Sequence, residues 1–379
     1  MQVLDRRLGE SLRDWAKGRK NMRPIGRVMS LLVAVAACLA LPPFDRIANA
    51  DAALSFAGKT VTIVIGSETG GTTDSSARLM GTFLAKYLPG KPTVIVQNRP
   101  GSHSMAAMNY FAQRVKPDGL TVAVASISQL DPENYRVPQS QYDPTQFNMV
   151  GGVDLGGGIL IARTDALPRI HDKTAQPLVM GAPAGLPHST MLITAWAKEY
   201  LGWNVRWVAG YPSPTPQMIL ALERGEVDMT GFSITGLTDS LFDQKKYTLL
   251  YQSGTARCTR PSSLKEISHV PLFRAAMDGK ISDPVAQQAF AYWCNASSTL
   301  VWMALPPETP AAVTDVYRSA FREIASDPEF LEQGKKFSVE FTTVTHESVD
   351  VAARAYGQVP PEVVSYIPKM LLRQGLKAN

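Results

Sequence analysis

The fold is decided by residues 61–87, which read VTIVIGSETGGTTDSSARLMGTFLAKY. The first five, residues 61–65, are apolar or β-branched and predict a buried strand. Residues 66–73 are small or polar and predict a loop, and residues 74–87 place apolar side chains at helical spacing. A buried strand that leads through a short loop into an amphipathic helix is typical of a parallel α/β sheet.

The same alternation continues along the chain. A strand at 94–96, a helix at 104–114 and a strand at 120–125 extend the first sheet. A chain of 379 residues with 45% hydrophobic and 19% charged side chains has room for two domains with a ligand cleft between them. Further strands are predicted at 159–162, 178–181, 205–208, 227–231, 247–252 and 298–305, and further helices at 189–201, 216–224 and 309–325.

The net charge of +5 does not belong to the body of the protein. Residues 1–50 carry nine basic and four acidic side chains, so the whole excess lies there. The remaining residues are neutral in sum, which argues against a nucleic-acid partner.

The N-terminus has the order of a secretory signal. Basic residues precede an apolar run at 28–41, and small residues follow at 48–50. We therefore expect residues 1–50 to be a cleaved signal peptide for export to the periplasm. An uncleaved anchor and a lipoprotein attached at Cys38 are the alternatives, and Met22 could be the true start.

Two cysteines, Cys258 and Cys294, lie beyond the signal. An even pair in an exported chain predicts a disulfide, and two buried free thiols are the alternative. The sequence has no CxxC motif and no histidine spacing typical of a metal site, so no metal is expected.

The loop Gly70-Gly71-Thr72-Thr73-Asp74 is the best candidate for binding. A glycine pair lets backbone N–H groups approach a ligand, and the following helix directs its free N–H groups to the same point. This favours a carboxylate or another small anion. No nucleotide-binding signature is present and no cofactor is expected. A plain tight turn is the alternative.

The next two loops lie at the same edge of a parallel sheet, where open α/β sheets bind ligands. Gly101, Ser102 and His103 follow the second strand, whereas Arg99 fits an ion pair within the structure better than a ligand contact. Ser126 and Ser128 follow the third strand.

In the middle of the chain, a strand-to-helix loop with Gly185 and His188 could face the first domain. A lone histidine such as His188 is more often structural. Neither a nucleophile elbow nor a His-Glu-x-x-His motif is present, so nothing in the sequence argues for an enzyme.

Several stretches resemble, in order, the Bug/TctC family, the extracytoplasmic solute receptors of tripartite tricarboxylate transporters. They are Gly70-Gly71-Thr72-Thr73-Asp74 with Ala77-Arg78, Val96-Gln97-Asn98-Arg99-Pro100-Gly101, Lys116-Pro117-Asp118-Gly119-Leu120-Thr121, Ala221-Leu222-Glu223-Arg224-Gly225-Glu226-Val227-Asp228 and Ala304-Leu305-Pro306-Pro307-Glu308-Thr309-Pro310.

The resemblance implies a two-lobed α/β fold of the Venus-flytrap type, similar to type II periplasmic binding proteins. Each lobe would be a mainly parallel sheet flanked by helices. The first lobe would comprise 51–155 and 296–379, and the second 156–295. The ligand would be a small carboxylate held in the cleft, and the partners would be the membrane permease subunits. We expect a monomer.

The resemblance, carried over by position, implies a cleft lined by Gly70, Gly71, Thr72, Thr73, Asp74, Gly101, Ser102, His103, Ser126, Ser128, Gly185 and His188. Asp228 would lie near this cleft. Two stretches depart from the family pattern. Ser102-His103-Ser104 replaces the usual Ala-Gly-Gly, and Gly66-Ser67 replaces Pro-Phe. A sensory receptor of the same fold is the first alternative function, and an α/β enzyme is the second.

Overall fold

The computed structural model describes residues 54–183, 189–211, 215–233, 239–243, 245–255, 257–296 and 298–376. They belong to one compact unit that begins at Ala53. The predicted signal, residues 1–50, lies outside the described residues. Within the described ranges, no helix is long and apolar enough to cross a membrane.

The first sheet has six strands in the order β11-β4-β10-β3-β1-β2. β1 lies between β2 and β3 and is parallel to both. Its side chains are buried on both faces, with Ile63 and Ile65 in one hydrophobic cluster and Val64 in another. Burial on both faces explains its continuous apolar run. The strands are β1 (Thr60–Ile65), β2 (Thr93–Asn98), β3 (Thr121–Ser126), β4 (Asn148–Asp154), β10 (Leu300–Leu305) and β11 (Thr342–Thr345).

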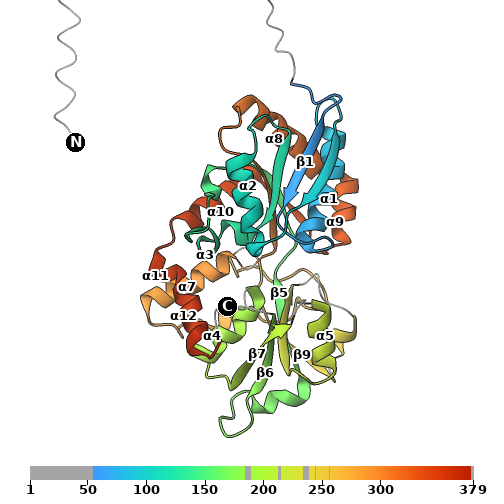
Figure 1. Cartoon of the computed structure of the whole chain (residues 1–379). Helices are drawn as coiled ribbons and strands as arrows, with labels where there is room; N and C mark the ends of the chain where they lie inside the picture. The colour runs from blue at the N-terminus through green and yellow to red at the C-terminus, as the bar shows by residue number, and fades with distance from the viewer. Residues whose placement is uncertain are drawn as a thin grey trace, which may run out of the picture. The chain divides into compact units, whose positions relative to one another are not determined.

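The second sheet has the order β7-β6-β8-β5-β9. It repeats the β2-β1-β3-β10-β4 order of the first sheet, with β6 in the place of β1 and β5 in the place of β10. Five strands of the first sheet and the five strands of the second sheet in Figure 1 thus have the same order. The strands are β5 (Gly158–Arg163), β6 (Leu178–Pro183), β7 (Val205–Tyr211), β8 (Met229–Ser233) and β9 (Tyr247–Gln252).

Most strands of each sheet run in one direction, as expected for mainly parallel sheets, and both sheets also contain antiparallel strands. β10 runs antiparallel between β3 and β4, and β5 runs antiparallel between β8 and β9. The physical reason is chain crossing. The chain leaves the first sheet at the carboxyl end of β4. It enters the second sheet at the edge where the other strands of that sheet have their carboxyl ends, so β5 runs antiparallel to its neighbours β8 and β9. β10 returns in the same way, and β11 pairs antiparallel to β4 at the border of the first sheet.

Helices cover both faces of the first sheet (Figure 1). One face carries α1 (Thr72–Tyr87), α8 (Ala311–Ser326) and α9 (Pro328–Lys335), which contact one another. α10 (His346–Gly357) packs on β4, and α2 (Met105–Arg114) contacts β1. Three further short helices are α3 (Pro132–Tyr135), α5 (Thr215–Glu223) and α6 (Phe273–Ala276).

The end of the chain packs beside the second sheet. α11 (Pro361–Val364) and α12 (Tyr366–Arg373) contact α7 (Pro284–Asn295), and α12 also contacts α4 (Leu192–Tyr200) (Figure 1). Gln374 Nε2 donates to the carbonyl oxygen of Ala195 at 2.8 Å. The boundaries 51–155 with 296–379 and 156–295 stay a prediction, and these contacts favour a first lobe that ends before α11.

The segments that cross between the sheets are joined to one another. Leu155 N donates to Thr299 O at 3.1 Å, and Thr299 N donates to Gly156 O at 2.8 Å. The buried carboxylate of Glu340, just before β11, accepts hydrogen bonds from Ser262 Oγ at 2.8 Å and from Ser263 N at 2.6 Å. The first two bonds join the two crossing segments to each other, and the bonds to Glu340 join the segment before β11 to a segment that follows β9.

The structure joins Cys258 and Cys294 in a disulfide, with Cα atoms 5.2 Å apart. Both residues are only 1% exposed. Cys258 follows β9 and Cys294 lies on α7. The bond therefore links the segment after β9 to α7, the helix that α11 and α12 also contact.

Candidate functional site

Three loops at the carboxyl edge of the first sheet are linked to one another. The loop after β1 is bonded to Asn98 at the end of β2, since Asn98 Nδ2 donates to Ser67 O at 3.0 Å. The loop after β2 is bonded to Gln129, which follows β3. The structure therefore brings together the first-sheet loops that the sequence selected.

Asp74 lies at the centre of the hydrogen bonds that join the loop after β1 to the end of β2, and it is 2% exposed. Arg78 donates to both of its oxygens, from Nε to Oδ2 at 3.0 Å and from Nη2 to Oδ1 at 2.8 Å. Gly70 N donates to Oδ2 at 2.9 Å and Asn98 Nδ2 donates to Oδ1 at 2.9 Å. With four hydrogen bonds taken within the protein, Asp74 shapes the loop and has little capacity left for a ligand.

The start of α1 supplies the groups best placed for an anion. Its first helical bond runs from Ser75 N to Gly71 O at 2.9 Å, so the N–H groups of residues 72–74 have no partner one turn back. Gly71 has φ −77° and only the Glu68 carbonyl, 3.7 Å away, near its missing Cβ. The N–H groups and helix dipole here favour a negative group.

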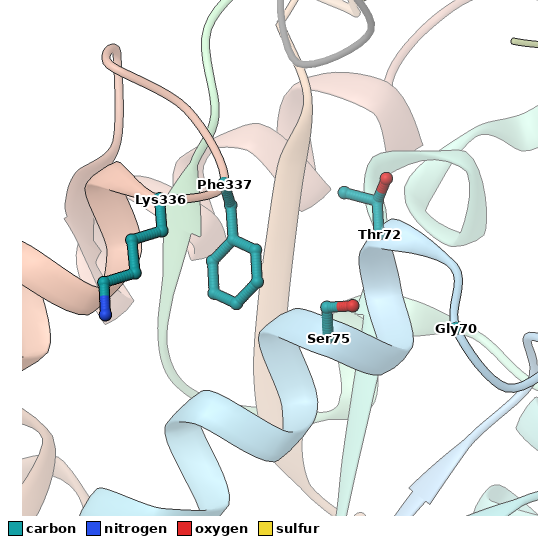
Figure 2. Close-up of a pocket in the computed structure, with 5 residues that line it drawn as sticks. All are labelled: Gly70, Thr72, Ser75, Lys336 and Phe337. Atoms are coloured by element: carbon teal, nitrogen blue, oxygen red, sulfur yellow. The ribbon is translucent and has the colours of Figure 1, made fainter. Parts of the chain in front are cut away.

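A cavity of about 250 Å³ opens beside this helix start. Figure 2 shows the Phe337 ring directed toward the first turn of α1, while the amine of Lys336 points away from it. The hydroxyl groups of Thr72 and Ser75 lie on the helix side of the cavity, next to Gly70. The cavity is thus lined by two hydroxyl-bearing residues of α1 and by an aromatic ring.

The second loop contains a left-handed turn. Gly101 has φ 137°, and the next three residues, Ser102, His103 and Ser104, have φ values of 47°, 51° and 71°. Each residue with a side chain costs roughly 1–2 kcal/mol in this conformation, so three in succession store considerable strain. Ser102 and His103 are exposed.

Contacts on two sides fix this turn. Gln129 Nε2 donates to His103 O at 3.1 Å, and Gln129 is only 4% exposed. On the other side Ser104 lies against Gly66, where an added Cβ would stand 2.3 Å from Ser104 Cβ. Only glycine leaves room for the turn at position 66.

Ser126 and Ser128 belong to the third loop, and Ser126 is bonded within the protein. Its N–H and Oγ donate to Gln129 Oε1 at 3.2 and 2.9 Å, and its carbonyl accepts from Trp302 Nε1 at 2.8 Å. Ser128 is exposed at the same edge, with its carbonyl bonded to Asn134. Ser126 therefore supports Gln129, whereas the Ser128 side chain faces outward.

Asp228 does not join this group of loops. It lies at the amino end of β8, where its carboxylate accepts from Arg169 Nη2 at 3.0 Å and from Val179 N at 2.9 Å. The carboxyl ends of β6 and β8 are at the other edge of the second sheet. Gly185 and His188 lie outside the described residues, so their placement stays a prediction.

Reasoning from the sequence missed four residues of this region. Arg78 had a local signal, since it stands four residues after Asp74 on one helix face. Gln129 also had one, three residues after a capping serine. Lys336 and Phe337 directly follow α9 and line the cavity beside the first loop, and no local pattern indicates that placement.

The pKa of Asp74 is lowered to about 2, chiefly by the hydrogen bond from Arg78. The pKa of Asp327 is also lowered to about 2, by bonds from Lys86 and Tyr87. A depressed carboxyl pKa stabilises the fold above the unfolded-state value, and this contribution is lost as pH falls through the folded-state value.

We therefore expect the free energy of unfolding to fall between about pH 4 and pH 2, and Asp74→Asn to remove part of that slope. Urea unfolding at several pH values measures it, with Asp327→Asn as the second variant. A wild-type slope in Asp74→Asn would contradict the role assigned to the Arg78 bond.

Among the described residues, no group of three or more histidine, cysteine, aspartate or glutamate side chains could hold a metal ion. The hydrogen-bond donors of the first sheet gather at its carboxyl edge, in a two-sheet α/β architecture whose crossing segments are joined by hydrogen bonds.

Solved structures of solute-binding proteins match this chain. A TctC solute-binding protein from Polaromonas is 16% identical, with 84% of this chain and 100% of that chain covered and a TM-score of 0.58. The protein Rpa4515 of R. palustris, solved with adipate, is 20% identical over 83% and 97%, with a TM-score of 0.57. MatC from Rhodopseudomonas palustris, with bound malate, is 16% identical over 82% and 98%, with a TM-score of 0.54.

These likenesses confirm the two-lobed α/β fold that the sequence motifs led us to expect. The Polaromonas protein is described as a solute-binding protein, and the other two structures contain malate or adipate. No family model and no curated protein sequence matches the chain.

Proposed function

We propose that this chain is an exported receptor, related to the Bug/TctC family, that binds a small carboxylate between its two lobes. The observation that best supports this proposal is the group of three loops that hydrogen bonds join at the carboxyl edge of the first sheet. Its centre is the start of α1, with N–H groups at 72–74 that have no helical partner and with the hydroxyl of Thr72 beside them.

In this proposal one ligand carboxylate accepts from the α1 N–H groups and from Thr72 or Thr73. Gly70 and Gly71 keep the backbone accessible, and Gly101, Ser102, His103 and Ser128 border the ligand. Asp74 and Ser126 act by positioning these loops. Gly185 and His188 would approach from the second lobe, and Asp228 is not needed.

Capture would follow from lobe closure without chemical turnover. Closure excludes water, which strengthens the polar contacts to the carboxylate. The permease subunits of a tripartite transporter are the proposed partners, and the periplasm is the proposed location, reached through the signal at 1–50. The carboxylates in two of the matched structures, malate and adipate, are suitable first probes.

The direct test is a titration of the chain without its signal with malate and with adipate, followed by calorimetry and by thermal unfolding. A ligand that binds only the folded form, at a hundred times its Kd, should raise the melting temperature by roughly 5 °C. Absence of any heat or shift over a wider panel of mono-, di- and tricarboxylates would refute the proposed ligand class.

The variant Gly71→Leu should weaken binding of the responding carboxylate about tenfold or more, or by about 1.4 kcal/mol. The reason is that Gly71 has an ordinary backbone conformation and free space, so the fold tolerates a side chain there. That side chain would cover the free N–H groups of α1. Calorimetry measures the affinity.

Ala312→Leu is the matched control, because Ala312 is exposed on α8 beyond the amino edge of the same sheet. It should leave both affinity and melting temperature unchanged. Equal affinity of Gly71→Leu and wild type would move the carboxylate away from the start of α1.

A further inference from the structure

The left-handed turn Gly101–Ser104 is the strained part of the candidate site. Three consecutive residues with side chains have φ values between 47° and 71°. Glycine would adopt this conformation without strain, yet the chain places serine and histidine there. Strain of this kind persists where surrounding contacts enforce it, and it gathers at functional positions.

The enforcing contacts involve the His103 carbonyl and Ser104, and not the exposed side chains of Ser102 and His103. Gln129 bonds the His103 carbonyl at 3.1 Å, and Gly66 accommodates Ser104. Ser102 and His103 keep their side chains exposed at the edge shared with the first loop. The fold would therefore keep this turn if both exposed side chains were removed.

We propose that Ser102 and His103 are specificity-determining residues that recognise an oxygen substituent next to the ligand carboxylate. The inference rests on the proposed function, in which the start of α1 already binds the carboxylate. A serine hydroxyl and an imidazole can each donate and accept, so they match a hydroxyl or keto oxygen on the neighbouring carbon. The ligand class is a hydroxy or oxo carboxylate.

A site built to bond a substrate hydroxyl discriminates strongly against an analogue without one. Malate has a hydroxyl next to a carboxylate, and adipate has none. The wild-type protein should therefore bind malate more tightly than adipate. Loss of the two side chains should reduce that preference.

The test uses Ser102→Gly, His103→Gly and the double variant. Each single change should weaken malate binding about tenfold, the size of one lost hydrogen bond, with adipate affinity nearly unchanged. The melting temperature without ligand should stay equal or rise by about 1–2 °C, since relief of the left-handed strain exceeds the added flexibility of glycine. A merely structural residue would show loss of stability together with loss of affinity.

Lys91→Gly is the matched control. Lys91 is also a left-handed residue with φ 45°, but it precedes β2 at the opposite edge of the sheet. Its replacement should change the melting temperature in the same direction and leave both affinities unchanged.

Two results would overturn the inference and they are distinguishable. If the wild type binds carboxylates but the glycine variants keep its malate-to-adipate ratio, the turn does not set specificity, and the proposed function stands. If the wild type binds no carboxylate, the proposed function fails and this inference fails with it.

Discussion

Asp74→Ala is expected to lower the free energy of unfolding by about 2–3 kcal/mol and to weaken carboxylate binding as a consequence. The change removes the acceptor of four hydrogen bonds, a side chain that is only 3% exposed. Gly70 N and Asn98 Nδ2 lose a partner between the first two loops. The Arg78 side chain is 49% exposed, so its charge returns to water, and the cost stays below that of breaking a fully buried pair.

Urea unfolding gives the stability change and calorimetry gives the affinity. Asp74→Asn keeps the shape and one acceptor, so its effect should be smaller, and Arg78→Ala should be smaller again. The double variant Asp74→Ala/Arg78→Ala should cost less than the sum of its parts, because the two residues share one bond. Full stability with lost binding would mean that Asp74 contacts the ligand directly.

The role of Asp74 also marks what the sequence could predict about the site. Glycines, hydroxyl groups and a carboxylate after a buried strand indicate a loop at a sheet edge, and the structure brings the three first-sheet loops together. The sequence motif alone does not predict that the Asp74 carboxylate accepts hydrogen bonds from Arg78, Gly70 and Asn98. This arrangement depends on where β2 ends beside β1, which is a tertiary contact.

The fold was predictable where periodicity is strong and less so elsewhere. β1, α1, β3 and β9 lie within two residues of their expected bounds. β4 was missed because Gly151 and Gly152 interrupt its apolar pattern, and β11 because it has only four residues, of which Val344 alone is apolar. The antiparallel direction of β5 and β10 could not be read locally, since it follows from where the chain crosses between the sheets.

The second large effect concerns the disulfide of the second sheet. Replacement of both Cys258 and Cys294 by alanine should lower the free energy of unfolding by about 3–4 kcal/mol, the value expected for a closed loop of this length. The two cysteines are 36 residues apart, so the bond restricts the unfolded chain over the whole segment that contains α6 and nearly all of α7. Urea unfolding with and without a thiol reductant measures it.

Reductant should destabilise the wild type by most of the loss seen in the double variant and leave the double variant itself unchanged. A single Cys258→Ala variant should resemble the double variant, because one cysteine alone cannot close the loop. Both side chains are buried between the segment after β9 and α7, so part of the loss in each variant is lost packing. The reduced wild type keeps this packing and should therefore stay slightly more stable than the double variant. Free thiols detected by alkylation of the unfolded, unreduced protein, with no effect of reductant on stability, would establish instead that the two cysteines serve only as buried apolar side chains.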